Sequence, residues 1–269
     1  MKLSFSTVGC PRWSWRNIVA TAHDLGYDGV EVRGVGKDIS VPSVPEFGAA
    51  RLSGTLENLA KMNLSVPCLA SDCCLNDASR RELTAREVRA YVDLAKLMGA
   101  PFVRVMGDAA VPEPTGEVDT QLVSGIAAEL GEYALSRGVT LLIETNGTWA
   151  NSEKLARLLS DIGSPAVRAL WDINHPFAFF HESPETTYGN LRQYLGHVHI
   201  KDATIENGKV HYAMMGYGQL PIERVVKLLK EGGYKGFYSL EWVKRWDTTL
   251  EEPGIVFAHY VNYMRALDA

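Results

Sequence analysis

An amphipathic helix, a glycine and a short apolar run recur in that order along the chain. The unit appears at residues 22–26 before 29–32, at 95–99 before 102–105, at 135–138 before 139–142, and at 229–233 before 236–240. Glycine supplies the left-handed residue that ends a helix. Continuously apolar strands are typical of a parallel sheet covered by helices. The repeat therefore predicts an α/β fold around a buried parallel sheet.

Four further strands are expected near residues 3–7, 64–70, 167–172 and 196–201, which brings the number to eight, alternating with helices. Eight such units in 269 residues fit a single (β/α)8 TIM barrel, a fold of about 250 residues. A doubly wound open sheet is disfavoured, because residues 8–11 after the first strand are not a glycine-rich phosphate loop. Since no linker divides the sequence, residues 1–269 are predicted to form one barrel domain.

The last four predicted strands each place a metal-ligand side chain at or near their carboxyl end. These side chains are Glu144, Asp172, His199 and Glu241. Period-two alternation puts each of them on the face of its strand that would line the barrel. Taken singly, an acid at a strand end is often a helix N-cap or the partner of a lysine. Together the four predict a site for one divalent cation, with Mn, Co, Mg or Zn as candidates.

Two residues beside these ligands are candidates for substrate binding. His175 follows Asp172 by three residues, at the start of a loop, where a histidine could otherwise be an ordinary surface residue. Lys201 extends past the strand end beside His199. It could neutralise an oxyanion or pair with one of the acidic ligands. His197, one layer below, fits a core histidine as well as a functional one.

Trp13 and Arg245 complete the predicted substrate-binding residues, both in loops that follow strands. Apolar walls around a few convergent polar groups are typical of a sugar-sized pocket, which favours an aromatic residue such as Trp13. Glu31 lies before the end of its strand, and Asp202 points away from the face that carries His199. We expect structural roles for Glu31 and Asp202.

Charge and cysteine content limit the partners. The formal net charge of -5 and the scattered basic residues disfavour nucleic acid. The four cysteines lack zinc-knuckle spacing and suggest no disulfide scaffold, so a reducing cytoplasm is the expected location. No apolar run approaches the roughly 18 residues of a membrane helix, so no membrane partner is expected. The predicted partner is a small sugar or polyol, and a homo-oligomer is compatible with the tyrosines of the C-terminal helix.

The ligand series resembles the xylose isomerase-like TIM barrel superfamily of sugar isomerases, epimerases and endonuclease IV-type barrels. The resemblance is carried by Glu144, by Asp172 with His175, by His199 within residues 199–202, and by Glu241. It implies a metal-dependent isomerase or epimerase acting on a sugar, a sugar phosphate or an inosose. Glu144 and Glu241 would then be an acid–base pair that moves a proton through a metal-stabilised enediolate, and His175 would orient a substrate oxygen.

Two alternatives stay open. Several epimerases of the superfamily carry a further acid after the fifth strand, but residues 146–151 contain none. The His-x-Lys-Asp run at residues 199–202 also resembles inosose dehydratases, which makes dehydration of a cyclic polyol ketone the second hypothesis. A non-catalytic sugar-binding barrel is the third. The acidic balance and the shortage of further ligands argue against the three-metal chemistry of DNA repair.

Overall fold

The computed structural model describes residues 1–109, 111–114 and 116–268. Eight parallel strands form one sheet in the order β2-β1-β10-β7-β6-β5-β4-β3. Their bounds are β1 (Lys2–Ser6), β2 (Gly29–Glu31), β3 (Cys68–Cys74), β4 (Phe102–Met106), β5 (Thr140–Glu144), β6 (Val167–Asp172), β7 (Leu195–Ile200) and β10 (Phe237–Leu240). Parallel bridges from Gly29 to Ser65 and from Val32 to Leu69 join the two edges, so the barrel is nearly closed. The predicted (β/α)8 fold is confirmed.

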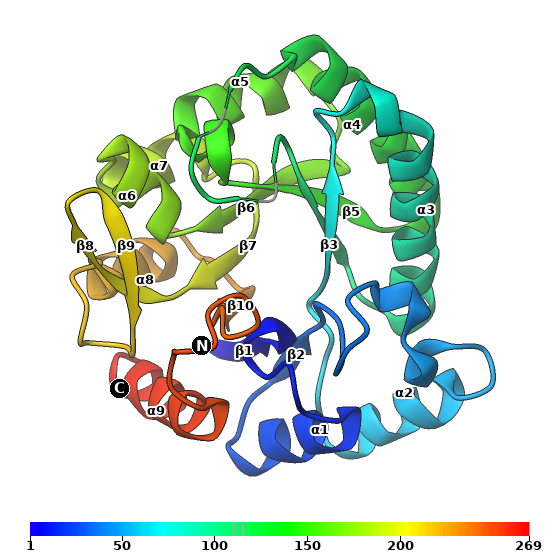
Figure 1. Ribbon diagram of the computed structural model, residues 1–269, viewed down its shortest axis with the longest axis vertical. Helices are drawn as coiled ribbons and strands as arrows, with labels where there is room; N and C mark the ends of the chain where they lie inside the picture. Colours follow the sequence, from blue (N-terminus) through cyan, green and yellow to red (C-terminus); the bar gives the residue numbers. More distant parts are fainter. Residues whose placement is uncertain (110, 115, 269) are drawn as a thin grey trace.

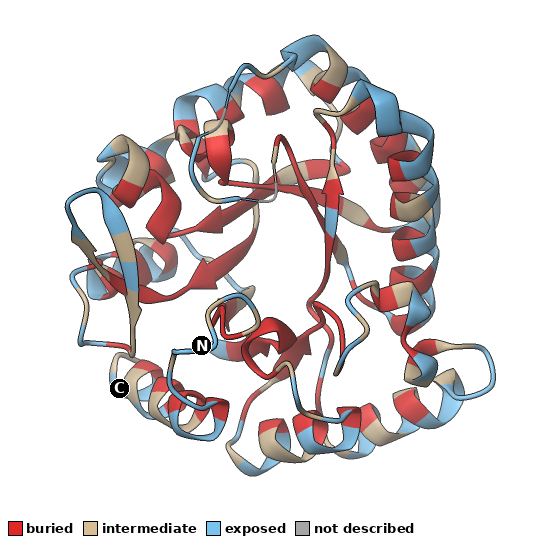
Figure 2. Cartoon of the chain, viewed as in Figure 1, coloured by how far each residue is buried: buried red, intermediate tan, exposed pale blue. Residues whose placement is uncertain are grey.

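Helices surround the sheet on the outside (Figure 1). They are α1 (Trp15–Asp24), α2 (Leu52–Lys61), α3 (Arg81–Met98), α4 (Thr120–Arg137), α5 (Ser152–Ile162), α6 (Asn174–Phe180), α7 (Pro184–Leu191), α8 (Ile222–Glu231) and α9 (Pro253–Ala266). Short 3-10 segments lie in the loops: η1 (Thr7–Gly9), η2 (Val41–Ser43), η3 (Pro45–Phe47), η4 (Ala78–Arg80) and η5 (Gly147–Ala150). Buried residues fill the strands and the inner faces of the helices (Figure 2).

The glycine stops behave as the repeat predicts. Gly26, Gly99, Gly138 and Gly233 all have positive φ angles, between 68° and 76°. At Gly99 and Gly138 the backbone N–H closes the last turn of α3 and α4. Each glycine therefore lets the chain turn from a helix back into the sheet without the steric cost that a side chain would add.

The third strand begins later than the sequence indicates, at Cys68 instead of near residue 64. The Ser65 carbonyl still accepts a hydrogen bond from Val30, so the chain already runs beside β2 at that point. Pro67 has no N–H to donate and interrupts the ladder between this contact and β3. The strand was placed correctly, but its start was wrong by about four residues.

A second sheet, which the sequence analysis missed, follows β7. The antiparallel hairpin of β8 (Asp202–Glu206) and β9 (Lys209–Ala213) stands beside the ring of barrel strands, at the left of Figure 1. Asn207 and Gly208 form its turn with φ angles of 51° and 76°. This Asn-Gly pair is the signal that could have revealed the hairpin, because two-residue turns with positive φ match the twist of the paired strands.

Asp202 fixes the base of this hairpin, so the predicted structural role is confirmed. Its buried carboxylate accepts hydrogen bonds from the backbone N–H groups of Ala203, Gly216, Gly218 and Leu220. Gly218 is required there, since a Cβ atom would lie 2.1 Å from the Asp202 carboxylate. The hairpin is thereby tied to the loop that precedes α8. Among the helices described, none is both long and apolar enough to cross a membrane.

Candidate metal and substrate site

The four predicted ligands meet at the carboxyl end of the barrel. Glu144 ends β5, Asp172 ends β6, His199 lies in β7, and Glu241 directly follows β10. The register pairs Asp172 with His199 and His199 with Ser239, which brings neighbouring strand ends to one level. One ligand atom from each of the four residues lies within 4.8 Å of the others, and all four side chains are buried.

The Nδ1 atom of His199 faces three carboxylates. It lies 3.7 Å from Glu144 Oε1, 3.9 Å from Asp172 Oδ2 and 3.5 Å from Glu241 Oε1. Among the described residues, this buried nitrogen has no hydrogen-bond partner. Ligands about 2.1 Å from a shared cation are separated by roughly 3–3.5 Å, so small inward shifts would complete such a site. The donor set therefore fits one divalent cation bound by oxygen and imidazole.

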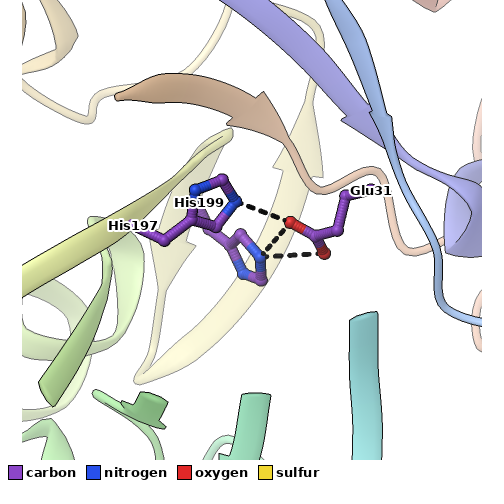
Figure 3. A group of neighbouring side chains, drawn as sticks. All are labelled: Glu31, His197 and His199. Carbon is purple, nitrogen blue, oxygen red and sulfur yellow. Dashed lines mark hydrogen bonds and ion pairs between the residues drawn. The ribbon is translucent and has the colours of Figure 1, made fainter. Parts of the chain in front are cut away.

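Glu31 lies beside the His197 and His199 rings and fixes the orientation of the His199 ring (Figure 3). The Glu31 carboxylate contacts the Nε2 atoms of His197 at 2.8 Å and of His199 at 3.0 Å, and it accepts a 3.0 Å hydrogen bond from the Ser239 hydroxyl. With Nε2 bound to Glu31, Nδ1 is the His199 nitrogen that faces the acidic cluster and could bind a cation after losing its proton. Sequence reasoning gave Glu31 a structural role, and the structure makes it the carboxylate that positions a candidate ligand.

Electrostatics follow from this arrangement. Burial alone would raise the pKa of Glu31, but His199 and His197 hold that pKa well below its usual value. Burial would lower the pKa of His199, yet the Glu31 and Glu241 carboxylates raise it well above the ordinary value. Burial dominates at His197 and lowers its pKa. The cluster therefore attracts positive charge to the side of His199 that faces the acids.

Two cations, Arg104 and Lys201, pair with the acidic ligands. Arg104 Nη1 donates to Glu144 Oε2 at 2.7 Å. Burial opposes this effect, but Arg104 lowers the pKa of Glu144 below its usual value. Lys201 Nζ lies 2.6 Å from Asp172 Oδ2 and also pairs with Glu241 Oε2. Of the two alternatives for Lys201, the structure shows the pairing with acidic ligands.

The charge of the cluster supports a cation site. The cluster holds four buried carboxylates, those of Glu31, Glu144, Asp172 and Glu241. Its permanent cations are Arg104, which pairs with Glu144, and Lys201, which pairs with Asp172 and Glu241. With His199 deprotonated, as a metal ligand must be, two negative charges are left over, and a divalent cation would balance them. Sequence reasoning missed Arg104, although an arginine inside the apolar run of β4 was a visible signal, because a buried guanidinium needs a partner.

His175 begins the first turn of α6 and reaches the same centre. Its Nδ1 lies 2.8 Å from the Thr145 carbonyl, which accepts the Nδ1 proton and leaves Nε2 for another partner. The same Nδ1 atom lies 3.9 Å from Glu144 Oε1 and 3.8 Å from Asp172 Oδ1. His175 also lines the main cavity. It is thus placed to contact a ligand there, as the sequence predicts.

A cavity of about 760 Å³ opens above the cluster. Glu144, Glu241, His175 and Lys201 line it together with Tyr212 from the hairpin. Its size lies within the range of about 300–1,000 Å³ typical of small-molecule sites. Burial raises the pKa of Tyr212 to about 12, so its hydroxyl stays protonated.

Two predicted substrate-binding residues, Trp13 and Arg245, are not brought to the cavity wall that the described residues form. The Trp13 ring packs edge-on against Phe257 with centroids 5.6 Å apart. The Arg245 guanidinium donates to the Gly36 carbonyl at 2.8 Å. Substrate binding by these two residues stays a prediction. Arg33 and Trp246 line the cavity instead, and no signal in the sequence indicated this position for Arg33.

An acidic and histidine cluster at the carboxyl ends of the strands, beneath a small-molecule cavity, defines this chain as a (β/α)8 barrel of the enzyme type. The chain belongs to the family described as xylose isomerase-like TIM barrel, whose model matches residues 19–260. The superfamily predicted from the ligand series is confirmed.

Individual relatives are epimerases and dehydratases. Fructoselysine 3-epimerase of Shigella flexneri is 23% identical over 278 residues, covering 99% of this chain and 98% of the relative. A probable 3-DHS dehydratase from Bacillus anthracis matches in structure with a TM-score of 0.81 at 16% identity, covering 98% and 99% of the two chains. A xylose isomerase-like TIM barrel protein from Mycobacterium smegmatis, solved with magnesium, gives 0.78 at 17% identity, covering 99% and 96%. The two solved structures show the same fold, and the curated relative supports an enzyme of the epimerase and isomerase class.

Proposed function

We propose that this protein is a divalent-metal-dependent sugar isomerase or epimerase. The observation that carries the proposal is the convergence of Glu144, Asp172, His199 and Glu241, with Glu144 and Glu241 lining a cavity large enough for a sugar. A 3-epimerase that matches nearly the whole chain supports the reaction class. A bound divalent cation would supply Lewis-acid stabilisation of the negative charge that develops on substrate oxygens.

Glu144 and Glu241 would move the proton. They come from β5 and from the end of β10, so a ketose lying between them meets one carboxylate on each face. One carboxylate removes the proton from the carbon beside the carbonyl, which gives an enediolate. The other returns a proton to the opposite face of a carbon, which inverts that centre or moves the carbonyl.

Three neighbours would assist this transfer. Arg104 stabilises the charged form of Glu144 and fixes its Oε2, which leaves Oε1 toward the centre. Lys201 faces the cavity with an ammonium group whose pKa Asp172 and Glu241 raise well above its usual value, against the opposing effect of burial. It can therefore donate to a substrate oxygen that gains negative charge. His175 would orient a second oxygen through Nε2.

Proton NMR in D2O tests the proposal directly. Purified protein, with Mn, Co or Mg restored, is incubated with ketoses, inososes and 3-dehydroshikimate. Deuterium entering a carbon beside the carbonyl, together with an isomeric product, is the expected result. Glu144→Gln should abolish the exchange while circular dichroism shows a folded barrel. Exchange at the wild-type rate in this variant would remove Glu144 from the mechanism.

Dehydration is the second candidate, and one observation favours it. The loop after β5 contributes Asn146 to the cavity, at a place where several epimerases carry an acid. Loss of water from a cyclic ketone in the same NMR experiment, without an isomer, would select the dehydratase. Sugar binding without exchange or water loss would instead identify a non-catalytic barrel.

A further inference from the structure

We propose that Arg33 binds an anionic group of the substrate, a carboxylate or a phosphate, and that Asp72 holds the guanidinium until that group displaces it. The inference deepens the proposed function and rests on it, because it concerns the far end of the same substrate. It follows from the position of Arg33, from its exchangeable partner and from the distribution of charge in the cavity.

Arg33 lies in the cavity wall, on the side of the barrel opposite Asp172, the candidate metal ligand of β6. It follows Glu31 by two residues on the same face of the chain, so it stands about 7 Å further toward the cavity mouth. In the barrel order, three strands separate β2 from β6 in either direction. A ligand held between Glu144 and Glu241 can therefore extend toward Arg33.

The backbone of Arg33 is held rigidly. Its N–H donates to the Thr7 hydroxyl at 2.8 Å, and that hydroxyl donates to the Gly34 carbonyl at 2.6 Å. Gly34 has a φ of 87°, and a Cβ there would lie 2.4 Å from the Asp38 carbonyl oxygen. The side chain itself is 2% exposed. A buried, fixed guanidinium is pre-organised to bind an oxyanion through two parallel hydrogen bonds.

Asp72 is an exchangeable partner for this cation. The two side chains form an ion pair, but the Asp72 side chain is 47% exposed, whereas Arg33 is almost fully buried. The remaining polar contact of the guanidinium is a long one, 3.3 Å to the Ile39 carbonyl. Asp72 can turn to solvent at little cost, because water can hydrate its carboxylate there. An anionic ligand can then take its place on Arg33.

Two guanidinium groups, those of Arg33 and Arg245, lie near each other. Burial, followed by the charge of Arg33, lowers the pKa of the neighbouring Arg245. Asp72 pairs with Arg33, and Arg245 donates to the Gly36 carbonyl. The Asp247 carboxylate also belongs to the cavity wall, but it accepts hydrogen bonds from the backbone and hydroxyl of Thr249. When Asp72 turns to solvent, Arg33 and Arg245 face only the Asp247 carboxylate among the described residues, so this end of the cavity favours an anion, whereas the acidic cluster favours a cation.

The size of the cavity leaves room for such a group. A free ketose fills only part of about 760 Å³. The Trp246 ring, 57% exposed, lies 5.7 Å from the Arg33 guanidinium carbon and forms an apolar wall beside it. A substrate with a sugar at the acidic cluster and an anionic group at Arg33 would use both ends of the cavity.

The test compares three ketoses that differ only at C6: D-fructose, D-fructose 6-phosphate and D-fructuronate. Isothermal titration calorimetry with metal-restored protein measures their affinities for the wild type, Arg33→Met and Asp72→Asn. Arg89→Met is the matched control, because Arg89 is an exposed arginine of α3 that pairs with Glu129 outside the cavity. The two anionic sugars distinguish phosphate from carboxylate.

We expect the wild type to bind one of the anionic sugars roughly 10- to 100-fold more tightly than fructose, the range for charge-assisted hydrogen bonds. Arg33→Met should bring this ratio close to one, and Arg89→Met should keep it. Asp72→Asn should increase it, because the competing carboxylate is gone. No anion preference in the wild type, or an unchanged ratio in folded Arg33→Met, would overturn the inference.

Asp72→Asn decides the matter if Arg33→Met does not fold, since the half-exposed Asp72 is not part of the core. A ratio that stays constant or falls in Asp72→Asn contradicts the inference. The proposed function is tested separately, because deuterium exchange measures catalysis and calorimetry measures binding. Arg33-dependent anion binding without exchange would reject the function and keep this site. Exchange without anion preference would keep the function and reject this site.

Discussion

Replacing Glu31 by Gln should weaken metal binding, although Glu31 is not one of the four candidate ligands. The Glu31 carboxylate accepts hydrogen bonds from both His197 and His199 through their Nε2 atoms. A glutamine amide has one oxygen, so its NH2 group must face one of the two rings. If it faces His199, Nε2 becomes the acceptor and the ring proton moves to Nδ1. That nitrogen faces the three acidic ligands, and once protonated it cannot bind a cation.

The magnitude follows from the role of such partners in metal sites. Loss of a carboxylate that orients a ligating histidine typically costs 10- to 100-fold in metal affinity. Each factor of ten corresponds to ~1.4 kcal/mol, so we expect the free energy of metal binding to weaken by ~1.4–2.8 kcal/mol. The assay is calorimetric titration of Mn or Mg into metal-free protein, with circular dichroism to establish that the barrel is folded.

Ser239→Ala is the matched control for this prediction. It removes one hydrogen bond from the same carboxylate but leaves the charge and the histidine tautomer unchanged. Metal affinity should stay close to that of the wild type. A folded Glu31→Gln protein that binds the ion as tightly as the wild type would refute the argument that Glu31 sets the His199 tautomer.

Three further predictions concern other parts of the chain. His175→Ala should spare bound metal and raise the KM about tenfold, so loss of metal in elemental analysis would make His175 a ligand. Asp202→Ala should lower the free energy of unfolding by about 2 kcal/mol or more, measured by denaturant titration, because buried backbone N–H groups lose their acceptor; an unchanged midpoint would contradict the anchoring role. Burial raises the pKa of the Cys74 thiol, so its alkylation at pH 8 should be slower than that of an exposed thiol. The alkylation rate should keep rising as the pH passes the ordinary thiol pKa. A rate that levels off at that pH would contradict this environment.

Local pattern was sufficient for much of the fold. The helix, glycine and strand repeat indicated the barrel, because glycine at a helix end and apolar residues in a covered strand depend on nearest neighbours in the chain. Asn207 and Gly208 show that the hairpin was equally readable, since turn chemistry is also local. The start of β3 was misplaced because Pro67 breaks the ladder there, an effect that depends on which strand lies alongside.

The sequence by itself also determined which side chains form the candidate ligand cluster. Strand periodicity assigns each ligand a face, and parallel strands end at the same edge of the sheet. Glu144 and His199 could therefore be brought together without coordinates. Their predicted roles in binding and catalysis rest on the experiments above.

Only the tertiary structure decided what surrounds these ligands. Glu31 meets His199 across 168 positions of sequence, and Arg104 meets Glu144 across 40. The tertiary structure also places Trp13 against Phe257 and Arg33 in the cavity wall. Such contacts depend on how strands stagger when the barrel closes and on how loops pack over its mouth, and periodicity within one strand carries no information about either.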